Sequence, residues 1–225
     1  IFTGGELPTG ADTVVVQEDT RRDGDTVIVT EVPRKGRHIR SAGLDFKQGE
    51  TLLKRGRLLT GRDLGLAAAM NHPILPVHRK PRVALLATGD ELVMPGRQPG
   101  PGQIVYSNGY SVATLARHEG ADVSDLGIAR DTVADTVAAI QDARMRRADV
   151  LVTMGGASVG DYDLVQQALK QEGMDLSFWK IAMRPGRPLM HGRLGPIHVL
   201  GLPGNPVSAF VCAVLFLVPL LRTLT

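Results

Sequence analysis

Residues 83–89 read VALLATG, a short apolar run that ends at a Thr-Gly pair. A run of this length without polar alternation is typical of a strand buried on both faces of a sheet. A second apolar run, residues 149–154 (DVLVTM), ends at Gly155 and Gly156. Strands of this kind are covered by helices on both sides, so the two runs indicate a sheet of the α/β class.

Helical and extended segments alternate around these runs. Apolar residues at helical spacing predict helices over residues 108–120, 132–140 and 164–173. A last helix is expected to begin with Asn205 as its N-cap and Pro206 at its first position. Further strands are expected over residues 123–128, 178–183 and 197–202. This order predicts a mostly parallel, doubly wound sheet with helices on both faces.

A smaller, β-rich region precedes the sheet. β-Branched runs at residues 13–17 and 26–30 flank an Asp-Gly pair, which is a hairpin signal. In the glycine-punctuated stretch that follows, Thr60 can cap a short helix that runs through Met70. We therefore expect three parts: a β-rich domain over residues 1–46, a connecting subdomain over 47–80, and an α/β domain over 81–225.

Composition narrows the possible functions. The 225 residues hold 26 Lys and Arg against 23 Asp and Glu, and this excess is too small to argue for a nucleic-acid partner. Five Phe, three Tyr and one Trp are too few for a base-stacking platform. The single cysteine excludes an internal disulfide framework and every multi-cysteine metal site. The composition favours a cytoplasmic protein.

Both ends of the chain lie inside patterned sequence. The first residues contain neither the basic segment nor the apolar segment of a signal peptide, so none is visible in this sequence. The closing apolar stretch, residues 207–221, is shorter than the roughly 20 residues that a membrane span needs and contains Pro219. We expect a buried helix there, no membrane partner, and a chain that is a fragment of a longer protein.

Glycines, carboxylates and arginines follow the carboxyl ends of the expected strands. In an open parallel sheet, ligands bind beyond those ends. Glycine loops bring backbone amides to an anion, arginines bind oxyanions, and carboxylates suit Mg²⁺. Each segment taken alone is equally typical of a turn, a helix cap or a solvated surface. Together they favour a phosphorylated substrate with Mg²⁺ between its phosphates and the carboxylates. The segments are residues 88–92, Asp131, 155–163, 184–188 and 202–206.

These ordered motifs resemble the molybdopterin molybdenumtransferases, the molybdenum-insertion enzymes that include the E domain of gephyrin. The resemblance covers nearly the whole chain. The motifs that carry it are TGGELP (3–8), GAD (10–12), RSAGLD (40–45), TGDEL (88–92), Ser107-Asn108, Asp131, GGASVGDYD (155–163), MRPGRP (183–188) and LPGNP (202–206).

The resemblance implies a reaction and a site. Enzymes of this family insert molybdenum from molybdate into adenylylated molybdopterin and release AMP in a Mg²⁺-dependent reaction. By motif, the catalytic residues would be Glu91, Asp131, Asp163 and Asp45, and the Mg²⁺ ligands Glu91, Asp161 and Asp163. The residues that bind substrate would be Thr3, Gly155, Gly156, Ser158, Lys180, Arg184, Arg187, Pro203 and Pro206.

The resemblance also implies partners, and alternatives remain. Family members are homodimers, and the molybdopterin adenylyltransferase that performs the preceding step is a possible partner. One alternative is that this chain is itself such an adenylyltransferase, although those enzymes carry a Gly-Gly-Thr-Gly loop where residues 155–158 read GGAS. A second alternative is a non-catalytic scaffold, because the E domain of gephyrin binds receptor tails.

Overall fold

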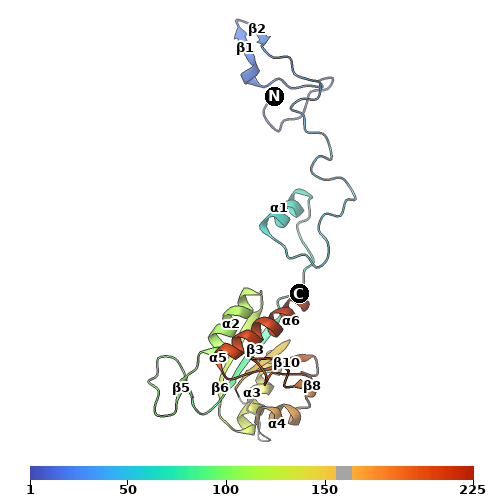
Figure 1. Cartoon of the computed structure of the whole chain (residues 1–225). Helices are drawn as coiled ribbons and strands as arrows, with labels where there is room; N and C mark the ends of the chain where they lie inside the picture. Colours follow the sequence, from blue (N-terminus) through green and yellow to red (C-terminus); the bar gives the residue numbers. More distant parts are fainter. Residues whose placement is uncertain (156–163) are drawn as a thin grey trace. The chain divides into compact units, whose positions relative to one another are not determined.

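The computed structural model describes residues 1–155 and 164–225. The chain divides into two units, Ile1–Leu75 and Pro76–Thr225 (Figure 1), and each is described by itself. The separate β-rich domain expected over residues 1–46 stays a prediction, as does its boundary with the connecting subdomain.

The first unit contains one hairpin and one helix. A 3-10 turn, η1 (Gln17–Asp19), leads into the antiparallel strands β1 (Thr20–Asp23) and β2 (Thr26–Val29). The strand predicted over residues 13–17 is therefore wrong, because Asp23 pairs with Thr26 and the tight two-residue turn draws the preceding residues, 20–23, into the ladder. The antiparallel hairpin itself is confirmed.

The helix predicted from Thr60 is confirmed as α1 (Gly61–Ala69). Thr60 and Asp63 form a capping box, in which Asp63 Oδ2 accepts bonds from the Thr60 amide (2.8 Å) and hydroxyl (2.7 Å). Arg57 donates to the other oxygen of the same carboxylate at 2.9 Å. Arg57 and Thr60 together lower the pKa of Asp63 from 3.8 to about 2.

This depressed pKa predicts a pH dependence of the first unit. The stabilisation by Asp63 is fully present above its ordinary pKa of 3.8 and is lost as the pH falls toward 2. We expect Asp63→Asn to remove the part of the acid-induced loss of helical circular dichroism that falls between these values. Glu6→Gln is the control, and an identical titration of the wild type and Asp63→Asn would contradict the assignment.

A six-stranded sheet forms the second unit, in the order β6-β3-β7-β10-β9-β8. β6, β3, β7 and β10 are parallel, and β9 is antiparallel to both β10 and β8. The predicted mostly parallel α/β sheet is thus confirmed as a mixed sheet. Its strands are β3 (Arg82–Thr88), β6 (Asp122–Ala129), β7 (Val150–Met154), β8 (Asp175–Trp179), β9 (Met190–Leu194) and β10 (Ile197–Leu202).

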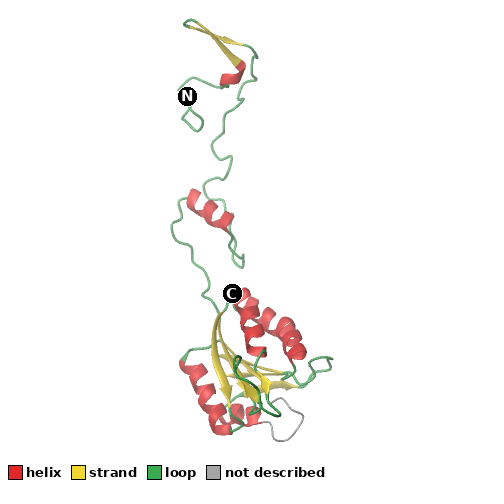
Figure 2. Ribbon diagram, turned by 90° about the vertical axis from the view of Figure 1, so that its left-hand side faces the viewer, coloured by secondary structure: helices red, strands yellow, loops and turns green. Residues whose placement is uncertain are grey.

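Helices cover both faces of this sheet, as Figure 2 shows. On one face, α2 (Asn108–His118) and the last helix pack on Val83, Leu85 and Val152. On the other, α3 (Val133–Met145) and α4 (Leu164–Gln171) pack on Leu86 and Leu151. Because alternate residues of β3 and β7 enter opposite clusters, both strands are buried on both sides, as their apolar runs predict. A short parallel pair, β4 (Leu92–Val93) and β5 (Ile104–Val105), lies outside the main sheet.

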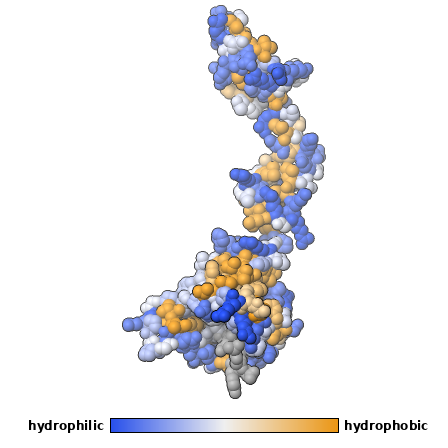
Figure 3. Space-filling model, viewed as in Figure 1, coloured by the Kyte–Doolittle hydropathy of each residue, from blue (hydrophilic) through white to orange (hydrophobic). Residues whose placement is uncertain are grey.

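The last helix is half-buried, which corrects the expectation of a buried one. It runs as α5 (Pro206–Cys212), a π-helical turn η2 (Ala213–Leu217) and α6 (Val218–Thr223). Pro219 has no N–H for the carbonyl four residues earlier, which accounts for the π turn just before it. The helix is long and apolar enough to span a membrane by composition, yet Cys212 and Leu221 are fully buried in the core. Its other side exposes Val207, Phe210, Val214 and Leu215, and Figure 3 shows hydrophobic residues gathered on this face.

Two strand predictions need correction at β8 and β9. The strand predicted over residues 178–183 is β8, which ends at Trp179 because Lys180 has a φ of 70° and leaves the extended conformation. β9 was not predicted, although it pairs with β10 across the turn at Gly195 and Pro196. In β9, buried Met190, Gly192 and Leu194 alternate with His191 and Arg193, so its apolar signal is weak.

Candidate functional site

The carboxyl ends of five strands lie at one edge of the sheet, here called the carboxyl rim. β3, β6, β7 and β10 are parallel, and β8 shares their direction because β9 is antiparallel to both β10 and β8. The carboxyl rim consists of residues 88–91, 129–132, 154–155, 179–189 and 202–206. Every predicted rim residue that the structure describes therefore lies at the same edge of the sheet.

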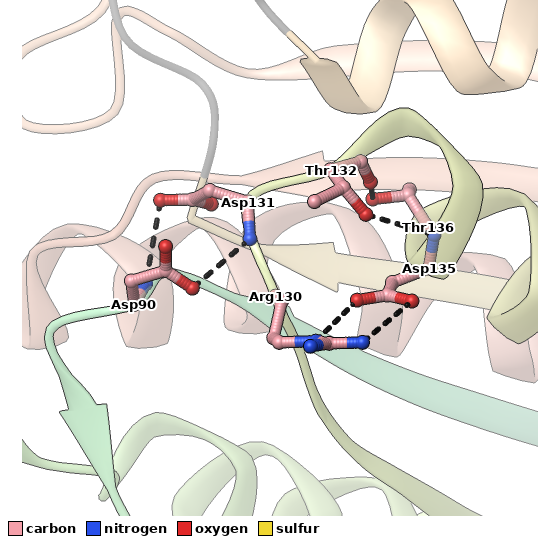
Figure 4. A network of polar contacts seen from close by, with 6 residues as sticks. All are labelled: Asp90, Arg130, Asp131, Thr132, Asp135 and Thr136. Atoms are coloured by element: carbon pink, nitrogen blue, oxygen red, sulfur yellow. Dashed lines mark hydrogen bonds and ion pairs between the residues drawn. The ribbon is translucent and has the colours of Figure 1, made fainter.

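Asp90 and Asp131 lock together at the β6 end of the carboxyl rim (Figure 4). The Asp90 amide donates to Asp131 Oδ2 at 3.3 Å, and the Asp131 amide donates to Asp90 Oδ1 at 3.2 Å. Each aspartate follows its strand by two residues, and the last residues of those strands, Thr88 and Ala129, are register partners. Equal offsets from paired parallel strands thus place the two carboxylates face to face.

The helix after Asp131 fixes this loop from its other side. Thr132 caps α3 by accepting the Asp135 amide at 3.1 Å. The Asp135 carboxylate pairs with Arg130 at 2.7 Å rather than completing the capping box (Figure 4). Arg130 is thereby engaged with Asp135 and forms no ion pair with Asp131.

Glu91 folds back over the glycine at the end of β3. A Cβ on Gly89 would lie 2.6 Å from Glu91 Oε2, and Gly89 has a φ of 142°. Residues with a side chain rarely adopt this φ, so the backbone conformation of the turn favours glycine here, and the carboxylate of Glu91 occupies the space beside it. Glu91 is exposed and directly follows Asp90, so three carboxylates gather within two neighbouring loops of the carboxyl rim.

Glycines let the central loops of the carboxyl rim approach one another. A Cβ added to Gly155 would lie 2.4 Å from the carbonyl oxygen of Thr88. A Cβ added to Gly204 would lie 3.7 Å from the Cα of Gly155. Asn108 Nδ2 donates to the Gly204 carbonyl at 2.7 Å and ties α2 to the same place. Gly155 at the end of β7 is therefore in contact with the ends of both β3 and β10.

Two buried hydroxyls lie beside these glycines. Thr88 is 4% exposed and Thr153 is 1% exposed, and neither hydroxyl has a hydrogen-bond partner among the described residues. Buried hydroxyls nearly always have one, in the protein or in ordered water. We therefore expect ordered water or substrate oxygen to complete their hydrogen bonds.

A cationic loop, residues 180–188, occupies the β8 end of the carboxyl rim. Lys180 Nζ lies 4.0 Å from the Trp179 ring centroid, a cation–π contact that holds the ammonium group in place. The Ile181 amide donates to the Arg187 carbonyl at 2.9 Å and closes the loop. Gly186 packs against Cys212, where a Cβ would lie 2.6 Å from Sγ. Burial raises the pKa of the Cys212 thiol, so it serves as packing under this loop.

The charges of the carboxyl rim are separated rather than clustered. β6 and β8 are the two edge strands, five inter-strand spacings apart. At about 4.8 Å per spacing, the ends of β6 and β8 are about 24 Å apart, and the ends of β3 and β9, which border Asp90 and the cationic loop, are about 14 Å apart. Arg184 and Arg187 are exposed, and neither forms an ion pair with a described residue. A ligand must be elongated to contact both groups.

The remaining predicted residues divide into three sets. Pro203 is buried after β10, and Pro206 is the first residue of α5. Thr3 and Asp45 belong to the first unit, where Arg40 holds the Asp45 carboxylate at 2.7 Å, and their part in the site stays a prediction. The residues that lie outside the described ranges are Gly156, Ser158, Asp161 and Asp163.

Sequence reasoning left out Asp90 and Asn108 as site residues. Both stand in quoted motifs, and the signal for Asp90 was its offset from the end of β3, which equals that of Asp131 from β6. Asn108 was expected only to begin a helix, and its contact with Gly204 joins positions 96 residues apart. Such a contact becomes visible only when the order of the strands is known.

The donor set at the β6 end fits Mg²⁺. Within residues 1–155 and 164–225, no group of three or more His, Cys, Asp or Glu could hold a metal ion. Asp90 Oδ2 and Asp131 Oδ1, however, take no part in the two bonds that join the pair. Mg²⁺ is commonly bound by one or two carboxylates together with substrate phosphates and water, so two hard oxygen donors suffice on the protein side.

Two protein families match the two parts of the chain. Residues 84–223 match the family described as a probable molybdopterin binding domain. Residues 1–71 match the MoeA N-terminal region (domain I and II).

Individual relatives agree with both matches. The chain is 39% identical to the molybdopterin molybdenumtransferase of Nostoc sp. over 100% of its own length and 52% of that protein. It is 40% identical to molybdopterin molybdenumtransferase 2 of Mycobacterium tuberculosis, over 99% of its own length and 56% of that protein. A solved molybdopterin biosynthesis moea protein from Pyrococcus horikosii superposes with a TM-score of 0.80 at 32% identity, over 97% of this chain and 54% of that one. The chain thus spans about half the length of the relatives that it matches.

Proposed function

Because this chain belongs to the family of probable molybdopterin-binding domains, we propose that the complete protein inserts molybdenum from molybdate into adenylylated molybdopterin and releases AMP. The observation that carries this proposal is the polarity of the carboxyl rim, with paired carboxylates at one end and a cationic loop at the other. An elongated substrate with a pterin at one end and an adenylate at the other suits such a rim.

The residues of the carboxyl rim have distinct roles in this proposal. Lys180, Arg184 and Arg187 bind oxyanions, either molybdate or substrate phosphate, through charge and N–H donors. The backbone of Gly155 lies against that of Thr88, so the chain leaves β7 in contact with the end of β3. The chemistry at molybdenum is that of the metal and the dithiolene, and the protein supplies position and electrostatics.

Asp90 and Asp131, with Glu91 beside them, would hold Mg²⁺ at the phosphates. When bound, Mg²⁺ neutralises phosphate charge and polarises the bond to the leaving group. The two aspartates are positioned by each other's backbone amides, so they need no rearrangement to accept a cation. Asp161 and Asp163, which follow β7 in the sequence, stay proposed ligands on the strength of their motif.

The decisive experiment supplies the full-length protein with adenylylated molybdopterin, Mg²⁺ and molybdate. AMP release that requires molybdate supports the proposal. Transfer of the adenylyl group of ATP to molybdopterin would instead identify an adenylyltransferase. The absence of both reactions would support a non-catalytic scaffold. Omission of Mg²⁺ tests the role of the metal, and AMP release at the full rate in its absence would contradict that role.

We also propose that the protein acts as a cytoplasmic homodimer. The apolar side of the last helix supports a self-association surface, because Phe210, Val214 and Leu215 expose two fifths or more of their area. The molybdopterin adenylyltransferase remains a proposed partner because it makes the substrate. Sedimentation of the full-length protein with and without a Phe210→Asp substitution tests the dimer, which the substitution should weaken.

A further inference from the structure

A cavity of about 410 Å³ lies at the amino edge of the sheet, opposite the carboxyl rim. It is lined by Arg79, Lys80, Arg82, Ala121 and Asp122. Arg82 and Asp122 are the first residues of β3 and β6 and are register partners. β3 advances about 3.3 Å per residue, so it separates the cavity from the carboxyl rim by about 20 Å. The cavity is therefore a different place from the candidate site.

The backbone that carries the three cations of this cavity is tied into the sheet. The Asp122 amide donates to the Pro81 carbonyl at 2.8 Å, and the Asp149 amide donates to the Arg82 carbonyl at 2.8 Å. The Arg82 amide donates in turn to Asp149 Oδ2 at 2.8 Å. Pro81 and Arg82 are thus held by bonds from two sides, and Arg79 and Lys80 directly precede this anchored pair.

Arg79 is also held through its side chain. Its two terminal nitrogens donate to the two oxygens of Asp149, both at 2.6 Å. This bidentate pair neutralises Asp149 and orients the guanidinium, because a planar fork fits a carboxylate in one geometry. The Arg79 guanidinium also holds the pKa of Asp149 below its usual range, so the pair stays charged at neutral pH.

Lys80 and Arg82 form no close ion pair. Neither has a side-chain nitrogen within 4.0 Å of a carboxylate oxygen in the described part of the chain. Arg82 acts on Asp149 only at longer range, where its charge helps to lower the pKa of that carboxyl. Three cationic side chains therefore line a cavity that has one aspartate, Asp122, in its lining. Ala121 is the one apolar residue of the lining, so the cavity offers no aromatic or apolar surface to a ring.

From this geometry we propose that the cavity binds a compact anion that carries a diphosphate group. Lys80 and Arg82 each pair with one phosphate, and the guanidinium of Arg79 provides a further donor from the side. Phosphate oxygens match these donors in charge and in hydrogen-bonding capacity. The absence of a stacking surface among the lining residues makes the diphosphate itself, rather than an attached base, the recognised group. This binding does not depend on the reaction proposed for the carboxyl rim.

The test is a calorimetric titration of the full-length protein with inorganic pyrophosphate in Mg²⁺-free buffer. We expect Lys80→Glu to raise the Kd by about ten-fold or more, and the milder Arg82→Gln by about five-fold, because each removes a charge-assisted contact. Arg117→Glu makes the same change of charge on exposed α2 outside the cavity and is expected to change the Kd by less than about two-fold. All three variants leave the carboxyl rim untouched.

Equal effects of Lys80→Glu and Arg117→Glu would overturn the proposal, because they would indicate a general field rather than a site. Unchanged binding in both Lys80→Glu and Arg82→Gln would overturn it as well. An AMP titration separates phosphate from nucleotide recognition. We expect AMP to bind no more tightly than inorganic phosphate, and tight AMP binding that is lost in Lys80→Glu would show that the base is recognised. Shifts of the Ala121 and Asp122 amide resonances place the bound pyrophosphate at this edge, and their absence at saturation would contradict the assignment.

Discussion

Asp131→Asn in the full-length protein is expected to lower molybdate-dependent AMP release by about 100-fold or more, since removal of one preorganised charge commonly costs that much. The new side chain would retain an amide oxygen that can accept the Asp90 amide, which is the contact that shapes the loop. The substitution therefore removes the charge and preserves the fold. Turnover measured under saturating molybdate, with circular dichroism as a check on folding, tests this expectation.

Glu91→Gln is expected to act in the same direction, because its carboxylate lies over Gly89 at the same end of the carboxyl rim. Asp175→Asn serves as the control, because it removes a carboxylate at the start of β8, on the opposite edge of the sheet. If Asp131→Asn turns over substrate at the wild-type rate, the β6 end of the carboxyl rim does not take part in the reaction. If Asp175→Asn lowers AMP release as much as Asp131→Asn does, the loss of activity reflects the change in net charge and not the carboxyl rim.

Much of the fold could be predicted because its signals are local. The apolar runs at residues 83–88 and 150–154 are buried on both sides and could hardly be anything except central strands. The cap residues Thr60 and Asn205 predict the starts of two helices, and in the structure the Thr60 hydroxyl bonds to Asp63 while Asn205 accepts the Ser208 amide. β9 was missed because its alternating His191 and Arg193 resemble a polar loop until β8 and β10 are placed beside it.

The positions along the carboxyl rim could be predicted from the sequence, but their arrangement could not. Sequence position assigns Asp131 and Arg184 to strand ends, and the rule that ligands bind at those ends brings them to one edge. The distance between them depends on strand order, which places β6 and β8 at opposite edges of the sheet. The phosphorylated substrate expected from the sequence would therefore have to extend along a rim whose carboxylates and cationic loop lie on different strands. Asp90 was overlooked because its partner is fixed by the register of β3 and β6, a non-local property.

Gly155→Ala is expected to destabilise the second unit by about 3 kcal/mol or more, since strain at a positive φ adds to a steric clash. Gly155 has a φ of 96°, which side-chain-bearing residues rarely adopt. The added Cβ would lie 2.4 Å from the Thr88 carbonyl oxygen, and that oxygen is backbone at the end of a central strand. Neither β3 nor β7 can move away without breaking the pairing of Ala87 with Met154.

Gly204→Ala is the matched control for this substitution. It stands in the adjoining loop, its Cβ would meet the Gly155 Cα at an ordinary 3.7 Å, and its φ lies outside the positive region. We expect its cost to stay below about 1 kcal/mol. Urea unfolding followed by the fluorescence of Trp179, which stands at the end of β8 in the same unit, compares the two variants. Equal unfolding midpoints would mean that the loop after β7 does not lie against Thr88, and the contact between the β3 and β7 loops would have to be abandoned.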